Sequence, residues 1–214
     1  MKTRSVWAYI YDNYLYDYDY FLLSGDDTHF IVENLRNVLD EMNVDPATPL
    51  YLGHWIPHDD TYFIGGGPGY LLNRHVVKIL VETVFPRCLA HTRTSAEDRM
   101  IGFCLQTVAG IVGNSSVDAY GAQRFHGMDP HFVGSFRGKD SNKRFFQDVY
   151  EFWGRHYGFK TGLELISSQS VSFHLLRKPF WIKRHHAILY KSCPRGTVLG
   201  DIFAGKNSTS SHYR

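Results

Sequence analysis

The strongest constraint on the fold is an alternation of short apolar runs with amphipathic stretches. A short apolar run over residues 19–24 ends at the acidic turn Gly25–Thr28, which is typical of a buried strand followed by a turn. Apolar residues then recur at three- and four-residue spacing from Ile31 to Met42. That spacing predicts an amphipathic helix directly after the acidic turn.

The same alternation continues along the chain. The expected strands are at residues 51–56 and 170–176, and the expected helices are at residues 76–84, 95–108 and 145–153. Strands that alternate with helices predict an α/β fold with a mostly parallel sheet flanked by helices. Ligands of such sheets bind at the carboxyl ends of strands, and the acidic turn follows one such end.

The two ends of the chain are less regular. Residues 7–20 carry six tyrosines, whose spacing fits a strand in its later part and a helix in its earlier part. The sequence leaves both interpretations open for this segment. The length of 214 residues fits one domain, over residues 1–200, followed by a polar tail at 201–214.

Composition excludes several classes of protein. Hydrophobic residues make up 43% and charged residues 21% of the chain, which excludes wholesale disorder. The net charge of +2 gives no basis for binding nucleic acid or an anionic membrane by charge alone. Neither a membrane-spanning run nor a signal-peptide core is present, and the absence of a CxxC pair argues against a thiolate zinc site. The 15% of aromatic residues fits either a large core or the recognition of sugar rings.

Three polar features could carry chemistry, and each has a structural alternative. Asp26 and Asp27 at the strand end suit a hard divalent cation, or they cap the following helix. His174 lies between apolar neighbours in an expected strand, where it is either a core residue or an imidazole ligand that joins Asp27. A mixed carboxylate and imidazole pair suits Mn²⁺ better than Mg²⁺.

The third feature is the pair Glu97–Asp98 at the start of an expected helix. Ser95 and Asp98 have the spacing of a capping box, and the functional alternative is a general base that faces a cleft.

The glycine-rich segment at residues 65–70 is an expected loop where backbone passes close to another group. It lacks the Gly-Lys-Ser/Thr of a phosphate-binding P-loop, and it does not open a helix in the way that a dinucleotide-binding motif does. The ligand of this loop therefore does not follow from its glycines.

The order of these segments is more specific than any one of them. The chain contains FLLSGDDT, ENLR, YLGHW, GGGPGYLL, a C-x15-C pair that encloses SAEDRMIG, VDAYGAQRFH and SVSFH. As an ordered set over about residues 7–176, these segments resemble the core 1 β-1,3-galactosyltransferase branch of the fringe-related β-1,3-glycosyltransferases. Members of that family are Golgi enzymes of GT-A type that transfer a sugar from a UDP donor.

The resemblance implies a role for each matching residue. Asp27 and His174 would bind Mn²⁺, Asp26 would lie near the donor, and Asp98 would be the catalytic base. The cleft would be lined by the glycine loop, and one disulfide is implied. The residues that match the cleft loop are Gly66, Gly67 and Gly69, and those that match the disulfide are Cys88 and Cys104.

The chain also departs from the family pattern. Gly25 stands where the family has the first of three consecutive acidic residues, and a pair of adjacent cysteines expected before the last strand is absent. A membrane anchor and the first part of the nucleotide-binding fold would precede Met1. The resemblance thus describes residues 1–200 as the C-terminal part of one GT-A-like domain, in a fragment or a degenerate relative.

The expected activity is that of a Mn²⁺-dependent inverting glycosyltransferase. It would transfer a hexose, with galactose to the 3-hydroxyl of protein-linked N-acetylgalactosamine as the first choice, from a UDP-sugar. The expected setting is the lumenal side of the Golgi membrane, with a glycan or glycoprotein acceptor and a possible homodimer. The main alternative is a non-catalytic pseudo-glycosyltransferase with a binding or chaperone-like role, and a metal-dependent hydrolase at Asp26, Asp27 and His174 is a third reading.

Overall fold

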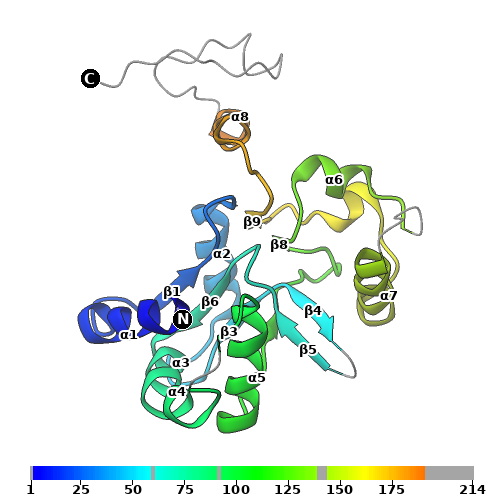
Figure 1. The fold of residues 1–214 in the computed structure, drawn as a ribbon. Helices are drawn as coiled ribbons and strands as arrows, with labels where there is room; N and C mark the ends of the chain where they lie inside the picture. Colours follow the sequence, from blue (N-terminus) through cyan, green and yellow to red (C-terminus); the bar gives the residue numbers. More distant parts are fainter. Residues whose placement is uncertain (1, 59–60, 91–92, 139–143, 191–214) are drawn as a thin grey trace, which may run out of the picture.

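The computed structural model describes residues 2–58, 61–90, 93–138 and 144–190. Its central sheet has four strands in the order β1-β6-β3-β7, which span Tyr20–Leu23, Tyr70–Asn73, Tyr51–Gly53 and Asn114–Ser115. A second sheet has the order β2-β9-β8, and β4 and β5 form a separate hairpin (Figure 1). The bounds of these five strands are His29–Phe30, Ser172–Phe173, Phe125–His126, Trp55–His58 and Thr61–Ile64.

The prediction of a mostly parallel sheet is wrong for the described residues. β6 pairs antiparallel with both β1 and β3, and only β3 and β7 pair parallel in the central sheet. β1, β3 and β7 do run in one direction, as the alternation of strands and helices predicts. However, the β4–β5 hairpin reverses the chain after β3, so β6 returns antiparallel and inserts between β1 and β3. The fold is therefore mixed α/β, which is compatible with a GT-A-like architecture.

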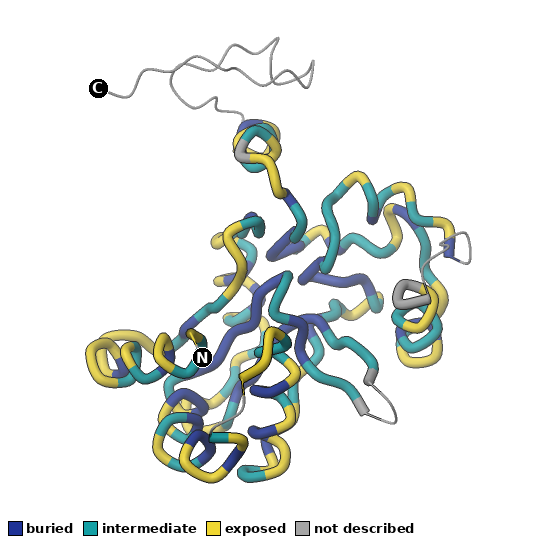
Figure 2. Tube along the Cα trace, viewed as in Figure 1, coloured by how far each residue is buried: buried dark blue, intermediate teal, exposed yellow. Residues whose placement is uncertain are grey.

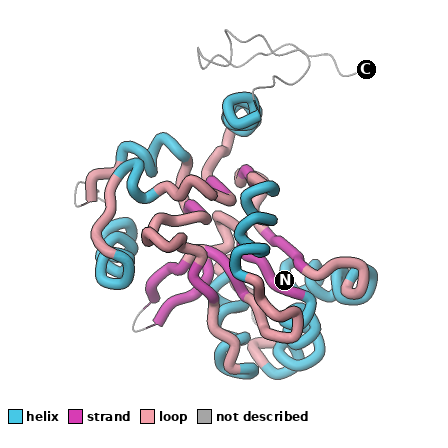
Figure 3. Tube along the Cα trace, turned by 180° about the vertical axis from the view of Figure 1, so that it is seen from behind, coloured by secondary structure: helices cyan, strands magenta, loops and turns pink. Residues whose placement is uncertain are grey.

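The helices surround the two sheets (Figure 3). Helix α2, Val32–Met42, confirms the predicted helix, although strand β2 lies between it and the acidic turn. Helices α5, Glu97–Ala109, and α7, Arg144–Tyr157, also confirm their predictions. The predicted helix at 76–84 is α3, Arg74–Ile79, which continues through a π-helical turn at Leu80–Val84 into α4, Phe85–Arg87. Two shorter helices, α6 at Pro130–Ser135 and a 3₁₀ turn at Gly162–Leu165, and a last helix α8 at Pro179–Tyr190 were not predicted.

The tyrosine-rich segment begins as helix α1, Lys2–Tyr14, and reaches β1 after a turn. Trp7 anchors α1, because its side chain is fully buried and its indole N–H donates to the Tyr70 hydroxyl at 3.2 Å. The helix interpretation of the earlier tyrosines is thus correct. The strand interpretation holds for Tyr20 alone among them.

Residues of β6 alternate between two hydrophobic clusters. Tyr70 and Leu72 face the cluster made with α1, α3 and α5, whereas Leu71 faces the cluster made with α2. Helices therefore cover both faces of the central sheet, and the buried residues are concentrated between them (Figure 2). None of the helices in the described part of the chain has the length and apolar character that a bilayer crossing requires. The predicted tail at 201–214 lies outside the described residues.

Candidate active site

Asp27 and His174 are brought together by the pairing of two short strands. β2 follows the acidic turn, and its His29 pairs with Phe173 of β9. Asp27 precedes β2 and His174 follows Phe173, so their side chains meet at the same edge, with 3.2 Å between Asp27 Oδ1 and His174 Nε2. The Leu176 N–H donates to the Asp27 carbonyl at 2.9 Å, which fixes the acidic turn against the segment after β9.

The hydrogen bonds of His174 determine what its second nitrogen can do. Nδ1 lies 3.1 Å from the carbonyl oxygen of Gly127, which can only accept, so Nδ1 carries a hydrogen. In the neutral imidazole, Nε2 then has a lone pair that faces the carboxylate of Asp27. Two acceptor atoms 3.2 Å apart repel each other unless a proton or a cation lies between them. A backbone carbonyl behind the distal nitrogen is also the usual second-shell contact of a metal-bound histidine.

Neither helix capping nor simple core packing accounts for this pair. The residue that caps α2 is Ile31, which makes no side-chain capping bond. Asp26 is exposed on the turn, next to Asp27 in the sequence. Within the described residues no group of three or more His, Cys, Asp or Glu side chains could hold a metal, so Asp27 and His174 would be two protein ligands.

Two residues, Arg177 and Gly25, lie near the carboxylate of Asp27. Arg177 Nε lies 3.9 Å from Asp27 Oδ2, and the arginine side chain is largely exposed. Gly25 lies on the other side, where a Cβ would be 3.0 Å from Asp27 Oδ1. The position of the family's first carboxylate is therefore directly beside the predicted metal ligand.

Asp98 contacts the glycine loop. Its Oδ2 accepts a hydrogen bond from the Gly66 N–H at 2.8 Å, and its Oδ1 accepts one from the Arg99 N–H at 2.8 Å. The predicted capping box is wrong, because Ala96 is the residue that caps α5 and no side chain caps this helix end. Asp98 thus links the first turn of α5 to the glycine loop.

The glycines of the loop allow close approach on both sides. A Cβ on Gly66 would lie 2.7 Å from Glu97 Oε1, and one on Gly67 would lie 2.5 Å from His174 Nδ1. Gly69 has a φ of +86°, and a Cβ there would lie 2.6 Å from Phe30 Cζ. The loop therefore touches both Asp98 and His174.

Side chains from the second sheet hold the loop in this position. The Thr28 hydroxyl donates to the Gly67 carbonyl at 2.7 Å, and the Ser172 hydroxyl donates to the Pro68 carbonyl at 2.6 Å. Both residues are next to or near the predicted metal ligands in sequence. Movement of the loop would therefore disturb the Asp27–His174 pair directly.

Glu97 lies beside Asp98 but points into the protein interior. Its Oε2 accepts a hydrogen bond from the Tyr70 hydroxyl at 3.2 Å, and Tyr70 in turn accepts from the indole of Trp7. Burial, and then the charge of Asp98, raise the pKa of Glu97 to about 7. The two adjacent carboxyl groups thus have different surroundings, which the sequence did not indicate.

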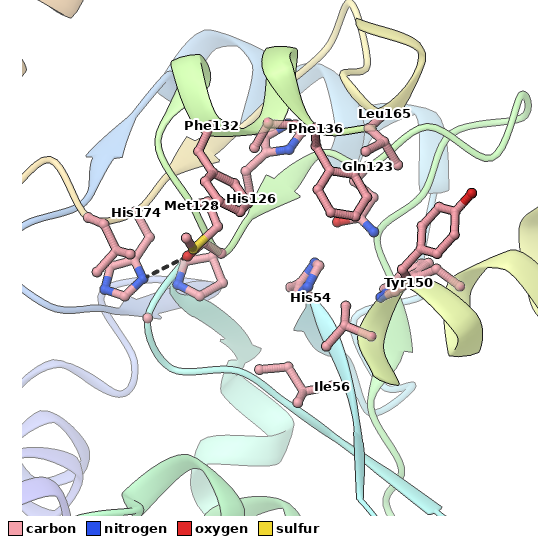
Figure 4. Close-up of a pocket in the computed structure, with 17 residues that line it drawn as sticks. His54, Ile56, Gln123, His126, Met128, Phe132, Phe136, Tyr150, Leu165 and His174 are labelled. Carbon is pink, nitrogen blue, oxygen red and sulfur yellow. Dashed lines mark hydrogen bonds between the residues drawn. The ribbon is translucent and has the colours of Figure 1, made fainter. Parts of the chain in front are cut away.

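A cavity of about 340 Å³ lies against the glycine loop at Gly67 and Pro68 (Figure 4). Gly67 and His174 form part of its rim, and aromatic residues of α6, of the position directly after α6 and of α7 form much of its wall. These aromatic residues are Phe132, Phe136, Tyr150 and Trp153. Sequence reasoning missed them, because aromatic residues at helical spacing have no feature that separates a cavity wall from a core.

The cavity wall carries no charged histidine at neutral pH in its deeper part. Burial lowers the pKa of His54 to about 4 and that of His126 to about 3. His126 Nε2 is 2.9 Å from the Ser170 hydroxyl, and the ring stacks on Phe173. These histidines therefore act as neutral, flat surfaces.

The disulfide implied by the resemblance is present between Cys88 and Cys104. It joins the end of α4 to the middle of α5, the helix whose first turn carries Asp98. The side chain of Arg4 reinforces the same region, where it donates to the carbonyls of Phe85 and Cys88. Cys193 lies outside the described residues.

One comparison with known proteins bears on this site. Over 177 residues the chain is 30% identical to the glycoprotein-N-acetylgalactosamine 3-beta-galactosyltransferase 1 of Xenopus laevis. The match covers 82% of this chain and 46% of that protein, so the chain spans about half the length of the curated relative it matches. No protein-family model matches the chain.

Proposed function

This chain is related to the β-1,3-galactosyltransferase family, and on that premise we propose that it is a Mn²⁺-dependent inverting glycosyltransferase. Its donor is a UDP-sugar and its acceptor is a glycoprotein. The name of the Xenopus relative favours galactose as the sugar and N-acetylgalactosamine as the acceptor. The Cys88–Cys104 disulfide supports an oxidising setting such as the Golgi lumen.

The observation that carries this proposal is the shared contact with the glycine loop. Asp98 accepts the Gly66 N–H, and the His174 ring lies against the next residue, Gly67. A base and a cation site held at consecutive residues of one short loop suit a displacement, because the base acts on the nucleophile and the cation acts on the leaving group.

Asp27 and His174 fit a Mn²⁺ ion by the chemistry of their donor atoms. A carboxylate oxygen faces an imidazole lone pair whose second nitrogen is engaged by the Gly127 carbonyl. When bound, the ion supplies positive charge next to the diphosphate leaving group. Arg177, which lies beside Asp27 and is exposed, is placed to add a second positive charge.

Asp98 is the proposed general base. Its carboxylate takes the proton of the acceptor hydroxyl as that oxygen forms a bond to the anomeric carbon of the donor sugar. The bond between that carbon and the UDP oxygen breaks on the opposite face, and its electron pair leaves with UDP. The configuration at the anomeric carbon is inverted, and the base contributes about 10²–10⁴-fold to the rate.

The alternative is a non-catalytic pseudo-glycosyltransferase, and Gly25 is the observation that favours it. The carboxylate that the family has at this position would lie beside Asp27 Oδ1, so its loss removes an oxygen from the surroundings of the metal. A domain of this kind would keep the fold and the glycine loop without binding the donor.

Calorimetry with UDP separates the two functions. The proposed enzyme binds UDP in the presence of Mn²⁺ and loses this binding when Mn²⁺ is omitted or when Asp27→Ala removes the carboxylate. A matched control is Asp148→Ala, because Asp148 is exposed on α7. If the wild-type chain binds neither UDP nor Mn²⁺, the pseudo-glycosyltransferase is correct.

A further inference from the structure

The cavity of Figure 4 has a surface that is mostly carbon. Two of the polar groups that line it are engaged within the protein, whereas His54 Nδ1 has no hydrogen-bond partner. The Trp153 indole N–H donates to the Trp55 carbonyl at 3.1 Å, and His126 Nε2 is bonded to the Ser170 hydroxyl.

This surface argues against a sugar ring as the occupant. Each hydroxyl of a hexose that loses water without gaining a protein partner costs roughly 1–3 kcal/mol. An apolar group gains free energy in the same place, because carbon surface is removed from water. The site therefore selects for an apolar occupant.

The size of the cavity indicates how large that occupant is. An apolar cavity of about 150 Å³ accommodates a benzene ring. A volume of about 340 Å³ has room for an aromatic ring together with the chain atoms that carry it. Phe132 and Phe136 line the wall and give flat surfaces against which such a ring can pack.

The position of the cavity connects it to the proposed reaction. Gly67 and His174 belong both to its rim and to the proposed cation site, and Gly66 next to them binds Asp98. An acceptor whose sugar hydroxyl reaches Asp98 therefore extends its neighbouring groups toward the mouth of this cavity.

We propose that the cavity is a subsite for an aromatic side chain of the acceptor polypeptide, close to the glycosylated residue. The proposal rests on the proposed transferase function and specifies its substrate class. The preferred acceptor is a glycopeptide with a bulky apolar residue near the acceptor sugar, and the free sugar is a poorer substrate because it leaves the cavity empty.

Two glycopeptides test the proposal with the wild-type chain. Both carry N-acetylgalactosamine on one threonine, and they differ by Phe or Ser, placed in turn at each position within two residues of that threonine. At the favourable position, kcat/KM for the Phe peptide exceeds that for the Ser peptide by about 10- to 100-fold, as expected for burial of one aromatic side chain. Equal values at every position would overturn the proposal.

A variant that fills the cavity tests whether the preference for the Phe peptide arises there. Val149 on α7 lines the cavity, so Val149→Phe occupies its space and reduces the ratio between the two peptides toward one. Val112→Phe is the matched control, because Val112 is 50% exposed and outside the cavity, and it keeps the wild-type ratio. If Val149→Phe lowers both peptides equally, the cavity holds the sugar and the proposal is wrong.

Binding measurements separate this proposal from the proposed function. Calorimetry of the two peptides without UDP or Mn²⁺ does not depend on turnover. Tighter binding of the Phe peptide without any transfer supports the subsite and contradicts the transferase. Transfer to both peptides with equal binding supports the transferase and contradicts the subsite, and the wild-type comparison holds whether or not Val149→Phe folds.

Discussion

Glu97→Gln is expected to stabilise the protein at pH 8 and to leave its stability unchanged near pH 4. Glu97 is partly buried against Tyr70 and next to Asp98, and its pKa rises from 4.5 to about 7. Between pH 4.5 and about pH 7, Glu97 is therefore protonated in the folded state and ionised in the unfolded state. Stability falls as pH rises through this window, and it levels off above about pH 7.

The size of the effect follows from the same two values. The difference between 4.5 and about 7 corresponds to roughly 3 kcal/mol at 1.36 kcal/mol for each pH unit, which is an upper limit for the partly exposed carboxyl. Glutamine has the shape of the protonated acid, and its oxygen keeps the hydrogen bond from the Tyr70 hydroxyl. The variant thus retains the packing and loses only the cost of ionisation.

Denaturant unfolding of both proteins at several pH values between 4 and 8 measures this difference. The gap in unfolding free energy opens between about pH 4.5 and pH 7 and reaches at most roughly 3 kcal/mol. Glu164→Gln is the matched control, since Glu164 is exposed, and it changes stability by less than about 0.5 kcal/mol at any pH. A constant gap across the whole pH range would refute the assignment of the raised pKa to Glu97.

The remaining predictions concern the metal pair and the disulfide. Gly67→Ala pushes a Cβ into the His174 ring and lowers Mn²⁺ affinity in calorimetry by about 10- to 100-fold, whereas Gly134→Ala, with its nearest atom at 3.5 Å, leaves the affinity unchanged. His174→Ala lowers Mn²⁺ affinity by more than Gly67→Ala, and an unchanged affinity would make His174 a packing residue. Reduction of Cys88–Cys104 lowers the unfolding free energy by about 3 kcal/mol in denaturant titrations, and no change on reduction would show that the bond does not constrain the unfolded chain.

Local periodicity predicted the elements whose secondary structure follows from the apolar spacing of their own residues. The strand before the acidic turn and the helices α2 and α5 follow from apolar spacing alone, because each buries one face against the core. The strand β6 was missed, since its four residues follow directly after the glycine loop and are all buried. A short run of this kind has no alternation, and only its pairing with β1 and β3 makes it a strand.

The candidate site shows the same limit more clearly. Asp27 and His174 were named from the sequence, and the alternation at residues 170–176 predicted the strand that contains β9. Their contact depends on the pairing of β9 with β2, a two-residue strand that no periodicity predicts. The spacing from Ser95 left a capping role open for Asp98, and in the structure its Oδ2 binds the Gly66 N–H. Such a contact joins residues 32 positions apart, so it depends on how the loop folds back and not on local sequence.

The role of Asp98 is the central claim, and Asp98→Asn tests it most directly. Transfer of labelled galactose from UDP-galactose to an N-acetylgalactosamine glycopeptide is measured with Mn²⁺ for the wild-type chain, Asp98→Asn and the neighbour control Glu97→Gln. Asparagine keeps one acceptor for the Gly66 N–H, so stability falls by only about 1 kcal/mol and UDP–Mn²⁺ binding is retained. Turnover falls by about 10²–10⁴-fold in Asp98→Asn and far less in Glu97→Gln. An Asp98→Asn variant that keeps most of its transfer activity would contradict the account.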